Sequence, residues 1–285
     1  MRGRRLTGAR SAGVISWYSH HIDRGGPLGK ARGWILEEAN WKAIRESSFE
    51  VAILPWGATE AHNYHLPYGT DTIQAGAVAG ESARIATERG ARVMVLPPIP
   101  YGVQTGQLDI PFCINVNPST QAALLADIAM SLDGQGVKSL VVLNGHGGND
   151  VRTMIRELQP KVRLFLCMVN WWTCVDARLF FAEPGDHAGE LETSMLMHIA
   201  PHLVLPLTEA GPGDARPFRV AGLREGWVWA PRQWTQVTED TGVGDPRASS
   251  ASKGAAFFEA ATGRIAAFLV DLAASDARDM YADAP

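Results

Sequence analysis

The chain of 285 residues has few cysteines, no long apolar run and no excess of positive charge. Its three cysteines, Cys113, Cys167 and Cys174, include no C-x-x-C pair, which argues against a disulfide framework and against a thiolate zinc site. No segment approaches the roughly 18 consecutive apolar residues of a membrane span. The formal net charge of −4 provides no overall positive field for a phosphate backbone. We therefore expect neither a nucleic acid nor a membrane as a partner.

Several arginines lie within the first ten residues, but no apolar run of roughly 7–15 residues follows them. This pattern favours a cytoplasmic protein over a secreted one. Hydrophobic residues make up 46% and charged residues 20% of the chain, which is typical of a folded globular protein. We predict an N-terminal arm over residues 1–34 and a single domain over residues 35–285.

From residue 49 onward, short apolar runs alternate with longer stretches of helical periodicity. They predict strands at 49–57, 91–99, 139–145 and 162–172, and helices at 72–90, 118–136, 151–159, 191–200 and 252–274. Such alternation is typical of βα units around a mostly parallel sheet, and about four or five strands are too few for a TIM barrel. Residues 209–250 are weakly periodic and are expected to form a long loop or a small irregular β insertion.

Three polar clusters follow predicted strands or lie in glycine-rich turns, and open α/β sheets bind their ligands at the carboxyl ends of strands. The clusters contain Glu60, His62, His65 and Asp71 at 55–71, His146 at 142–150, and His187, Glu190 and Glu192 at 185–194. Carboxylates mixed with imidazoles suit Zn²⁺, Mn²⁺ or Fe²⁺ better than Ca²⁺. Simpler roles stay open, because His146 could hydrogen-bond its own loop and the acidic residues near 190 could favour a helix N-terminus.

Four stretches together resemble the creatininase (creatinine amidohydrolase) family over roughly residues 35–275. They are Glu60-x-His62-x-x-His65-Leu-Pro with Asp71 downstream, Asn144-Gly-His146-Gly-Gly-Asn149, His187-Ala-Gly-x-x-Glu192-Thr-Ser194, and Thr241-Gly-Val-Gly-Asp245-Pro246 followed by Lys253-Gly254. The resemblance implies a three-layer α/β/α sandwich with a mostly parallel sheet, assembled as a homohexamer.

The same resemblance implies a centre of two divalent ions per chain, Zn²⁺ and/or Mn²⁺ or else Fe²⁺. Glu60 and His146 would bind one ion, His62 would bind the other, and Asp71 would bridge the two. A carboxylate in that position holds two ions about 3.5–4 Å apart, and a shared water loses a proton near neutral pH. The expected reaction is hydrolysis of an amide or related C–N bond in a small molecule.

The expected catalytic residues are His187 and Glu192, with His187 transferring a proton to the leaving nitrogen. One departure from the family concerns the metal ligands. Creatininases proper carry a glutamate two residues after the histidine of the second motif, where this chain has Gly148. We hypothesise that Glu190 replaces that carboxylate as a metal ligand.

A second departure concerns the substrate. The position of a tryptophan in creatininases is Glu183 here, and residues 101–111 lack the Ser and His common in the family, so creatinine itself is not the expected substrate. A more polar pocket would accept a hydroxylated or cationic amide, lactam or formamide. The expected substrate-binding residues are His65, Gln107, Asp109, Trp171, Trp172 and Glu183. Ordinary core packing stays the alternative for the tryptophans, as does the orientation of a metal ligand for His65.

Two alternative functions stay open. On the same metal site, the enzyme could hydrolyse another polar ring, such as a keto-sugar or keto-inositol, or a peptide terminus. From another class, the chain could be a non-catalytic protein that binds a metal or a ligand, although structural zinc sites are usually rich in cysteine. The tryptophan-containing segment 227–234 could form a subunit contact, a lid over a neighbour's site, or a loop with its own small core.

Overall fold

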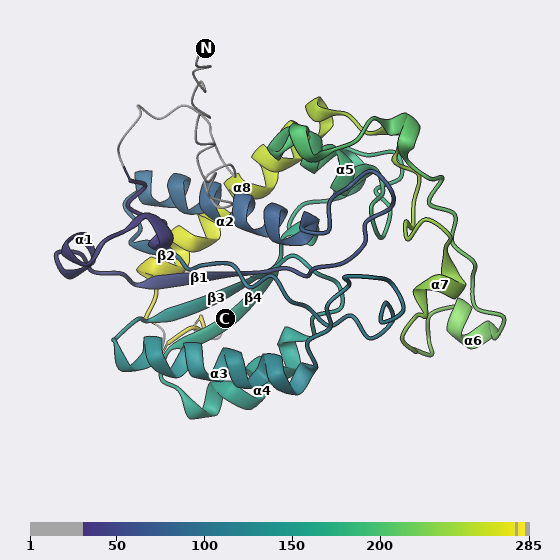
Figure 1. Cartoon of the computed structure of the whole chain (residues 1–285). Coiled ribbons are helices and arrows are strands. Elements are labelled where there is room, and N and C mark those ends of the chain that lie inside the picture. The colour runs from purple at the N-terminus through teal and green to yellow at the C-terminus, as the bar shows by residue number, and fades with distance from the viewer. Residues whose placement is uncertain (1–30, 277–278, 283–285) are drawn as a thin grey trace, which may run out of the picture.

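A computed structural model describes residues 31–276 and 279–282 (Figure 1). The predicted arm at 1–34 therefore lies almost wholly outside the described residues. The centre of the molecule is a sheet of four parallel strands in the order β2-β1-β3-β4. The strands are β1 (Val51–Trp56), β2 (Val93–Val95), β3 (Ser139–Asn144) and β4 (Phe165–Asn170). The predicted strand at 91–99 is shorter in the structure because Pro97 and Pro98 cannot donate to the ladder.

Helices cover both faces of the sheet, which confirms the α/β/α sandwich (Figure 1). One layer contains α2 (Thr70–Glu88), α5 (Glu190–Ile199) and α8 (Ala251–Ala274), and the other contains α3 (Pro118–Gly134) and α4 (Val151–Leu158). Short helices α1 (Trp41–Arg45), α6 (Ala221–Arg224) and α7 (Trp234–Val237) lie outside these layers. The segment 209–250 forms a long loop, the first of the two expected alternatives, with short helices and turns and an isolated bridge between Val243 and His187.

The strands alternate their side chains between two hydrophobic cores. Val51 and Ile53 of β1 pack in the core beneath α2 and α8, whereas Leu54 and Trp56 pack in the core beneath α3 and α4. All six residues of β1 and of β3 are buried. A parallel sheet covered on both faces requires such continuous apolar strands, and this is why the strands stood out in the sequence.

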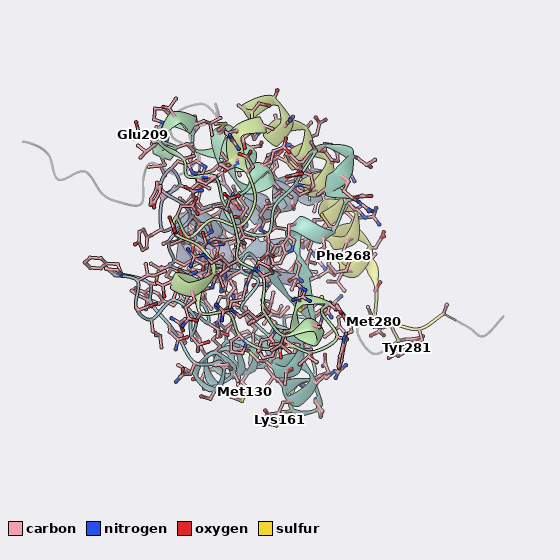
Figure 2. All side chains as sticks on the ribbon, turned by 90° about the vertical axis from the view of Figure 1, so that its right-hand side faces the viewer. Met130, Lys161, Glu209, Phe268, Met280 and Tyr281 are labelled. Atoms are coloured by element: carbon pink, nitrogen blue, oxygen red, sulfur yellow. The ribbon has the colours of Figure 1, made fainter. Side chains whose placement is uncertain are left out.

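The chain reverses its direction of winding at β1. From β1 it passes through α2 to β2 on one side, and it then crosses through α3 to β3 on the other side. The carboxyl ends of β1 and β3, paired at Trp56 and Asn144, therefore form the switch point at which such sheets bind ligands. Figure 2 views the molecule from this end, with Met130 of α3 and Phe268 of α8 in opposite layers.

Helix α8 is the longest described helix, with 24 residues, and it packs closely against α5. No helix within the described ranges has the length and hydropathy needed to cross a membrane. The approach of α8 to α5 depends on Gly254, because a Cβ at that position would lie 1.9 Å from the carbonyl oxygen of Ser194. By contrast, a Cβ at Gly263 of the same helix would meet no atom within 4 Å.

We predict that Gly254→Ala destabilises the protein by about 1–3 kcal/mol, since the added methyl group forces α5 and α8 apart. Gly263→Ala is the matched control and should stabilise the protein by up to about 1 kcal/mol through its higher helix propensity. Urea denaturation followed by circular dichroism measures both. Equal stability of Gly254→Ala and the wild type would contradict this description of the α5–α8 contact.

Candidate metal centre

The candidate site lies at the carboxyl ends of β1 and β3. The loop after β1 carries Glu60 and His62, the first turn of α2 carries Asp71, and the loop after β3 carries His146. Gly145 lets β3 approach α2 closely, because a Cβ there would lie 2.8 Å from the Asp71 carbonyl oxygen. The fold thus brings residues from three separate segments to one point.

These four side chains form a tight cluster with Asp71 at its centre. Asp71 Oδ1 lies 2.9 Å from His62 Nε2, and Asp71 Oδ2 lies 3.0 Å from His146 Nδ1. His146 Nδ1 is also 2.8 Å from Glu60 Oε1. Asp71 therefore lies between two imidazoles, with each of its oxygens against a different ring.

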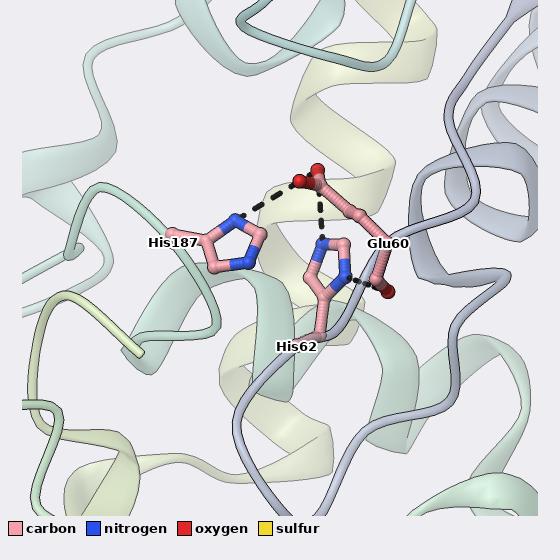
Figure 3. Close-up of side chains that lie close together, drawn as sticks. All are labelled: Glu60, His62 and His187. Carbon is pink, nitrogen blue, oxygen red and sulfur yellow. Dashed lines mark hydrogen bonds and ion pairs between the residues drawn. The ribbon is translucent and has the colours of Figure 1, made fainter. Parts of the chain in front are cut away.

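His187 approaches the same cluster from the loop before α5. Its Nδ1 lies 4.0 Å from Glu60 Oε1, and its ring lies 4.1 Å from the ring of His62, centroid to centroid. Figure 3 shows both imidazoles directed at the Glu60 carboxylate. The sequence predicted this grouping, and the structure brings His187 together with Glu60 and His62.

Backbone carbonyls orient all three imidazoles. His62 Nδ1 bonds the Glu60 carbonyl at 3.2 Å, His146 Nε2 the Val103 carbonyl at 3.1 Å, and His187 Nε2 the Ala61 carbonyl at 2.8 Å. A carbonyl oxygen only accepts, so His62 Nδ1 and His187 Nε2 donate their hydrogens, while His146 Nε2 also lies 3.1 Å from the Gln104 amide nitrogen. In a neutral ring the second nitrogen then presents a lone pair to the carboxylates, as in metal-binding histidines.

Buried charge dominates the electrostatics of the cluster. Burial opposes a charge on His62, but Asp71 beside it raises the pKa of the imidazole to about 10. Burial also opposes a charge on Glu60, yet the His146 and His187 rings hold the pKa of that carboxyl well below its usual range. Burial raises the pKa of the Glu192 carboxyl to about 7. Carboxylates at this depth require positive partners, either imidazolium groups or metal cations.

The donor set fits divalent cations. Two three-residue groups share Asp71, namely Glu60–Asp71–His146 and His62–Asp71–Glu192, and a third group is Glu60–His62–His187. Asp71 Oδ2 is buried and receives no hydrogen bond. The ring nitrogen His146 Nδ1 lies 3.0 Å from this oxygen. A cation between Asp71 Oδ2 and His146 Nδ1 would accept a lone pair from each of these two atoms. Imidazole and carboxylate ligands suit Zn²⁺, Mn²⁺ and Fe²⁺.

The structure places Glu192, and not Glu190, beside the centre. Glu192 Oε2 lies 3.9 Å from His62 Nε2 and accepts a hydrogen bond from the Ala188 amide at 2.6 Å. The Glu190 carboxylate instead pairs with Lys253 and accepts a bond from the Glu183 amide. Residues two apart on a helix point in different directions, so only one of these glutamates can face the cluster.

Gly148 itself has no room for a side chain. A Cβ at this position would lie 2.4 Å from His146 Nε2 and 2.5 Å from the Val103 carbonyl oxygen. The backbone here therefore cannot carry a third carboxylate at Gly148. The structure offers Glu192 as the third carboxylate of the cluster, beside Glu60 and Asp71.

Two residues expected at the substrate instead support the cluster from behind. Gln107 is buried and donates to Glu60 Oε2 at 2.6 Å, while it accepts a bond from the Cys113 thiol. His65 Nε2 lies 2.9 Å from Thr193 Oγ1, next to Glu192. The Gln107 contact fixes the orientation of the candidate ligand Glu60, whereas His65 contacts Thr193, the neighbour of Glu192 in the sequence.

A cavity of about 1040 Å³ opens beside the cluster, with Glu60, Asp71, His146, His187 and Glu192 in its wall. Of the expected substrate residues, only Trp172 also lines it. Trp171 is buried in the core against Phe257, whereas Asp109 and Glu183 are exposed and lie outside the cavity wall.

The sequence analysis missed several polar and aromatic residues that line this cavity. They are Gln104, Arg152, Trp229, Arg232 and Trp234. The two tryptophans belong to the segment 227–234, for which the sequence left a subunit contact, a lid over a neighbour's site and a loop with its own core open, and both line the cavity of this chain. No sequence pattern identified Gln104, Arg152 or Arg232.

Comparisons with known proteins identify the family of this chain. The family model of creatinine amidohydrolase (creatininase) matches residues 37–269. A Bacteroides fragilis protein of known structure, provisionally named a creatinine amidohydrolase, is 41% identical with a TM-score of 0.83, over 88% of this chain and 99% of that chain. The mycofactocin precursor peptide peptidase of Mycobacterium ulcerans is 32% identical over 74% of this chain and 81% of that protein.

More distant relatives are also hydrolases. The creatinine amidohydrolase of Pseudomonas putida is 28% identical over 54% of this chain and 66% of that protein, and the 3-dehydro-scyllo-inosose hydrolase of Thermotoga maritima is 25% identical over 60% and 58%. A manganese form of creatininase, 22% identical with a TM-score of 0.68 over 84% of this chain and 98% of that chain, shares the fold. The chain therefore belongs to the creatininase family of hydrolases.

Proposed function

We propose that this chain is a dinuclear metal-dependent hydrolase that cleaves the C–N bond of a small amide, lactam or formamide. The observation that carries this proposal is the position of Asp71 between His62 and His146, with one oxygen facing each ring. We assign one ion to Glu60, Asp71 and His146 and the other to His62, Asp71 and Glu192. Creatininases of the same fold occur in manganese and zinc–zinc forms, which supports Mn²⁺ or Zn²⁺.

Bound divalent ions would lower the pKa of a water molecule and polarise the substrate carbonyl. The side chains of the protein supply the remaining functions. His187 Nδ1 is free of the bond that holds Nε2, so it can accept a proton and pass it to the leaving nitrogen. The side chain of Glu192 is 20% exposed, compared with 2% for Glu60 and for Asp71, so Glu192 is the most exposed of the three carboxylates in the cavity wall.

The cavity supports a catalytic role over a purely structural one. Structural metal sites are closed, whereas this cluster lies in the wall of a cavity of about 1040 Å³. That volume lies at the upper end of the usual range for ligand pockets, about 300–1,000 Å³. The size favours a substrate larger than creatinine. Hydrolysis near a peptide terminus is therefore the second candidate, supported also by the similarity to a peptide peptidase.

The assembly and location expected from the sequence belong to the same proposal. We infer a homohexamer in the cytoplasm that acts on a small molecule. The support for this inference is the membership of the chain in the creatininase family.

We predict that the protein reconstituted with Mn²⁺ or Zn²⁺ hydrolyses at least one member of a panel of amides, lactams, formamides and short peptides. Asp71→Asn should abolish this activity because it removes the carboxylate shared by both ions. Glu88→Gln is the matched control, since it alters an exposed carboxylate on the same helix. Release of amine is the measurement. A protein that carries two ions and cleaves no member of the panel would contradict the proposed function.

A second prediction concerns the third carboxylate. Glu192→Gln should reduce the metal content from two ions per chain to one, because the amide is a weaker ligand for the ion at His62. Glu190→Gln should retain both ions and should instead lower the melting temperature, since Lys253 loses its carboxylate partner and keeps only the bond to the Ala248 carbonyl. Elemental mass spectrometry and thermal unfolding separate the two effects. The loss of an ion from Glu190→Gln alone would restore the hypothesis drawn from the sequence.

A further inference from the structure

His187 is enclosed by two aromatic rings from distant parts of the chain. His62 lies on one side at 4.1 Å, and Trp234 lies on another at 4.7 Å, both measured between ring centroids. Trp234 is 9% exposed and begins the short helix α7. It comes from the segment 227–234, which no step of the proposed reaction uses.

The other contacts of His187 fix its backbone and one ring nitrogen. Its amide donates to the Val243 carbonyl, its carbonyl accepts from the Val243 amide, and Nε2 donates to the Ala61 carbonyl. A single hydrogen bond at Nε2 does not by itself fix the rotation of the ring about its Cβ–Cγ bond. Trp234 fills the cavity wall beside the ring, so it limits this rotation.

Trp234 is itself held by contacts on several sides. Its amide donates to the Gly106 carbonyl at 2.9 Å. The guanidinium carbon of Arg232 lies 4.6 Å above the indole ring, within the range of a cation–π contact. Arg232 Nη1 also donates to Asp186 Oδ2 at 2.6 Å, and Asp186 immediately precedes His187. A series of contacts therefore connects Asp186 to Arg232, Arg232 to Trp234 and Trp234 to His187, the residue that follows Asp186.

Backbone geometry shows that the segments carrying these residues approach one another closely. A Cβ at Gly106 would lie 2.0 Å from the Arg232 carbonyl oxygen, so only glycine permits the segment to approach that far. Ala188, directly after His187, has a φ of 51°, which is uncommon for a residue with a side chain. The Gly106 contact brings the segment that carries Trp234 close to the cavity wall, and the Trp234 ring lies 4.7 Å from the His187 ring.

We propose that Trp234 is a positioning residue that holds the His187 imidazole with Nδ1 directed at Glu60 and the candidate metal centre, and that Arg232 clamps Trp234 in place. The inference rests on the proposed function, because proton transfer by His187 belongs to it. Displacement of a catalytic group by about 1 Å can lower a rate about 100-fold. Loss of the indole should therefore lower kcat more than it changes KM.

The test combines kinetics with structure. Trp234→Leu removes the stacking surface, Trp234→Phe retains an aromatic ring, and Trp227→Leu makes the same replacement at an exposed tryptophan of the same segment. Each is measured for metal content, kcat and KM in the wild-type background, and Trp234→Leu is also measured together with His187→Ala. Crystal structures of the wild type and of Trp234→Leu give the orientation of the His187 ring.

We expect Trp234→Leu to retain both ions, to lower kcat about 10–100-fold and to rotate the His187 ring in the crystal. Trp234→Phe should recover most of the rate, and Trp227→Leu should match the wild type. In the His187→Ala background, Trp234→Leu should add no further loss. An equal loss in both backgrounds, or an unmoved His187 ring, would overturn the proposal.

The outcomes also separate this inference from the proposed function. If the metal-loaded wild type cleaves no substrate, the proposed function fails, yet the crystal structures still decide whether Trp234 holds the ring. If the wild type is active and the ring keeps its orientation without the indole, the positioning role alone fails.

Discussion

The structure depends on the burial of carboxylates at the end of a parallel sheet. Glu60 and Asp71 are both buried, and buried carboxylates are costly unless positive charge lies within contact distance. The surrounding imidazoles present lone pairs when cations are bound and can carry protons toward the carboxylates when no cation is bound. Asp71 faces His62 with one oxygen and His146 with the other. Two cations, one on each side of Asp71, would therefore offset the negative charge of the carboxylates and bind the lone pairs of the carboxylate oxygens and ring nitrogens.

The fold creates this arrangement through its winding. The reversal at β1 opens the carboxyl ends of β1 and β3, and Gly145 allows the loop after β3 to reach the first turn of α2. Backbone carbonyls then aim each imidazole at the carboxylates. Substrate access follows from the same geometry, since the cavity extends outward from these strand ends.

Local patterns of apolar strands and polar turns were sufficient to predict the mostly parallel sheet and the three polar clusters, whereas the three layers and the roles of individual ligands followed from the resemblance to the creatininase family. The hypothesis of Glu190 as a ligand rests on the departure from the family at Gly148, and sequence spacing does not reveal that the Glu192 carboxylate is the one that lies beside His62. The lining of the cavity was harder to predict. Gln107 supports Glu60 and Trp171 fills the core, while Trp234 contacts His187 across 46 intervening residues, and such long-range packing leaves no periodic trace.

The most direct test of the two-ion centre is a crystal structure of the metal-loaded protein with anomalous diffraction collected on both sides of the zinc and manganese absorption edges. We expect two anomalous peaks about 3.5–4 Å apart on either side of the Asp71 carboxylate, one next to Glu60 and His146 and the other next to His62 and Glu192. A single peak, or a second peak coordinated by Glu190, would contradict the assignment of the ligands.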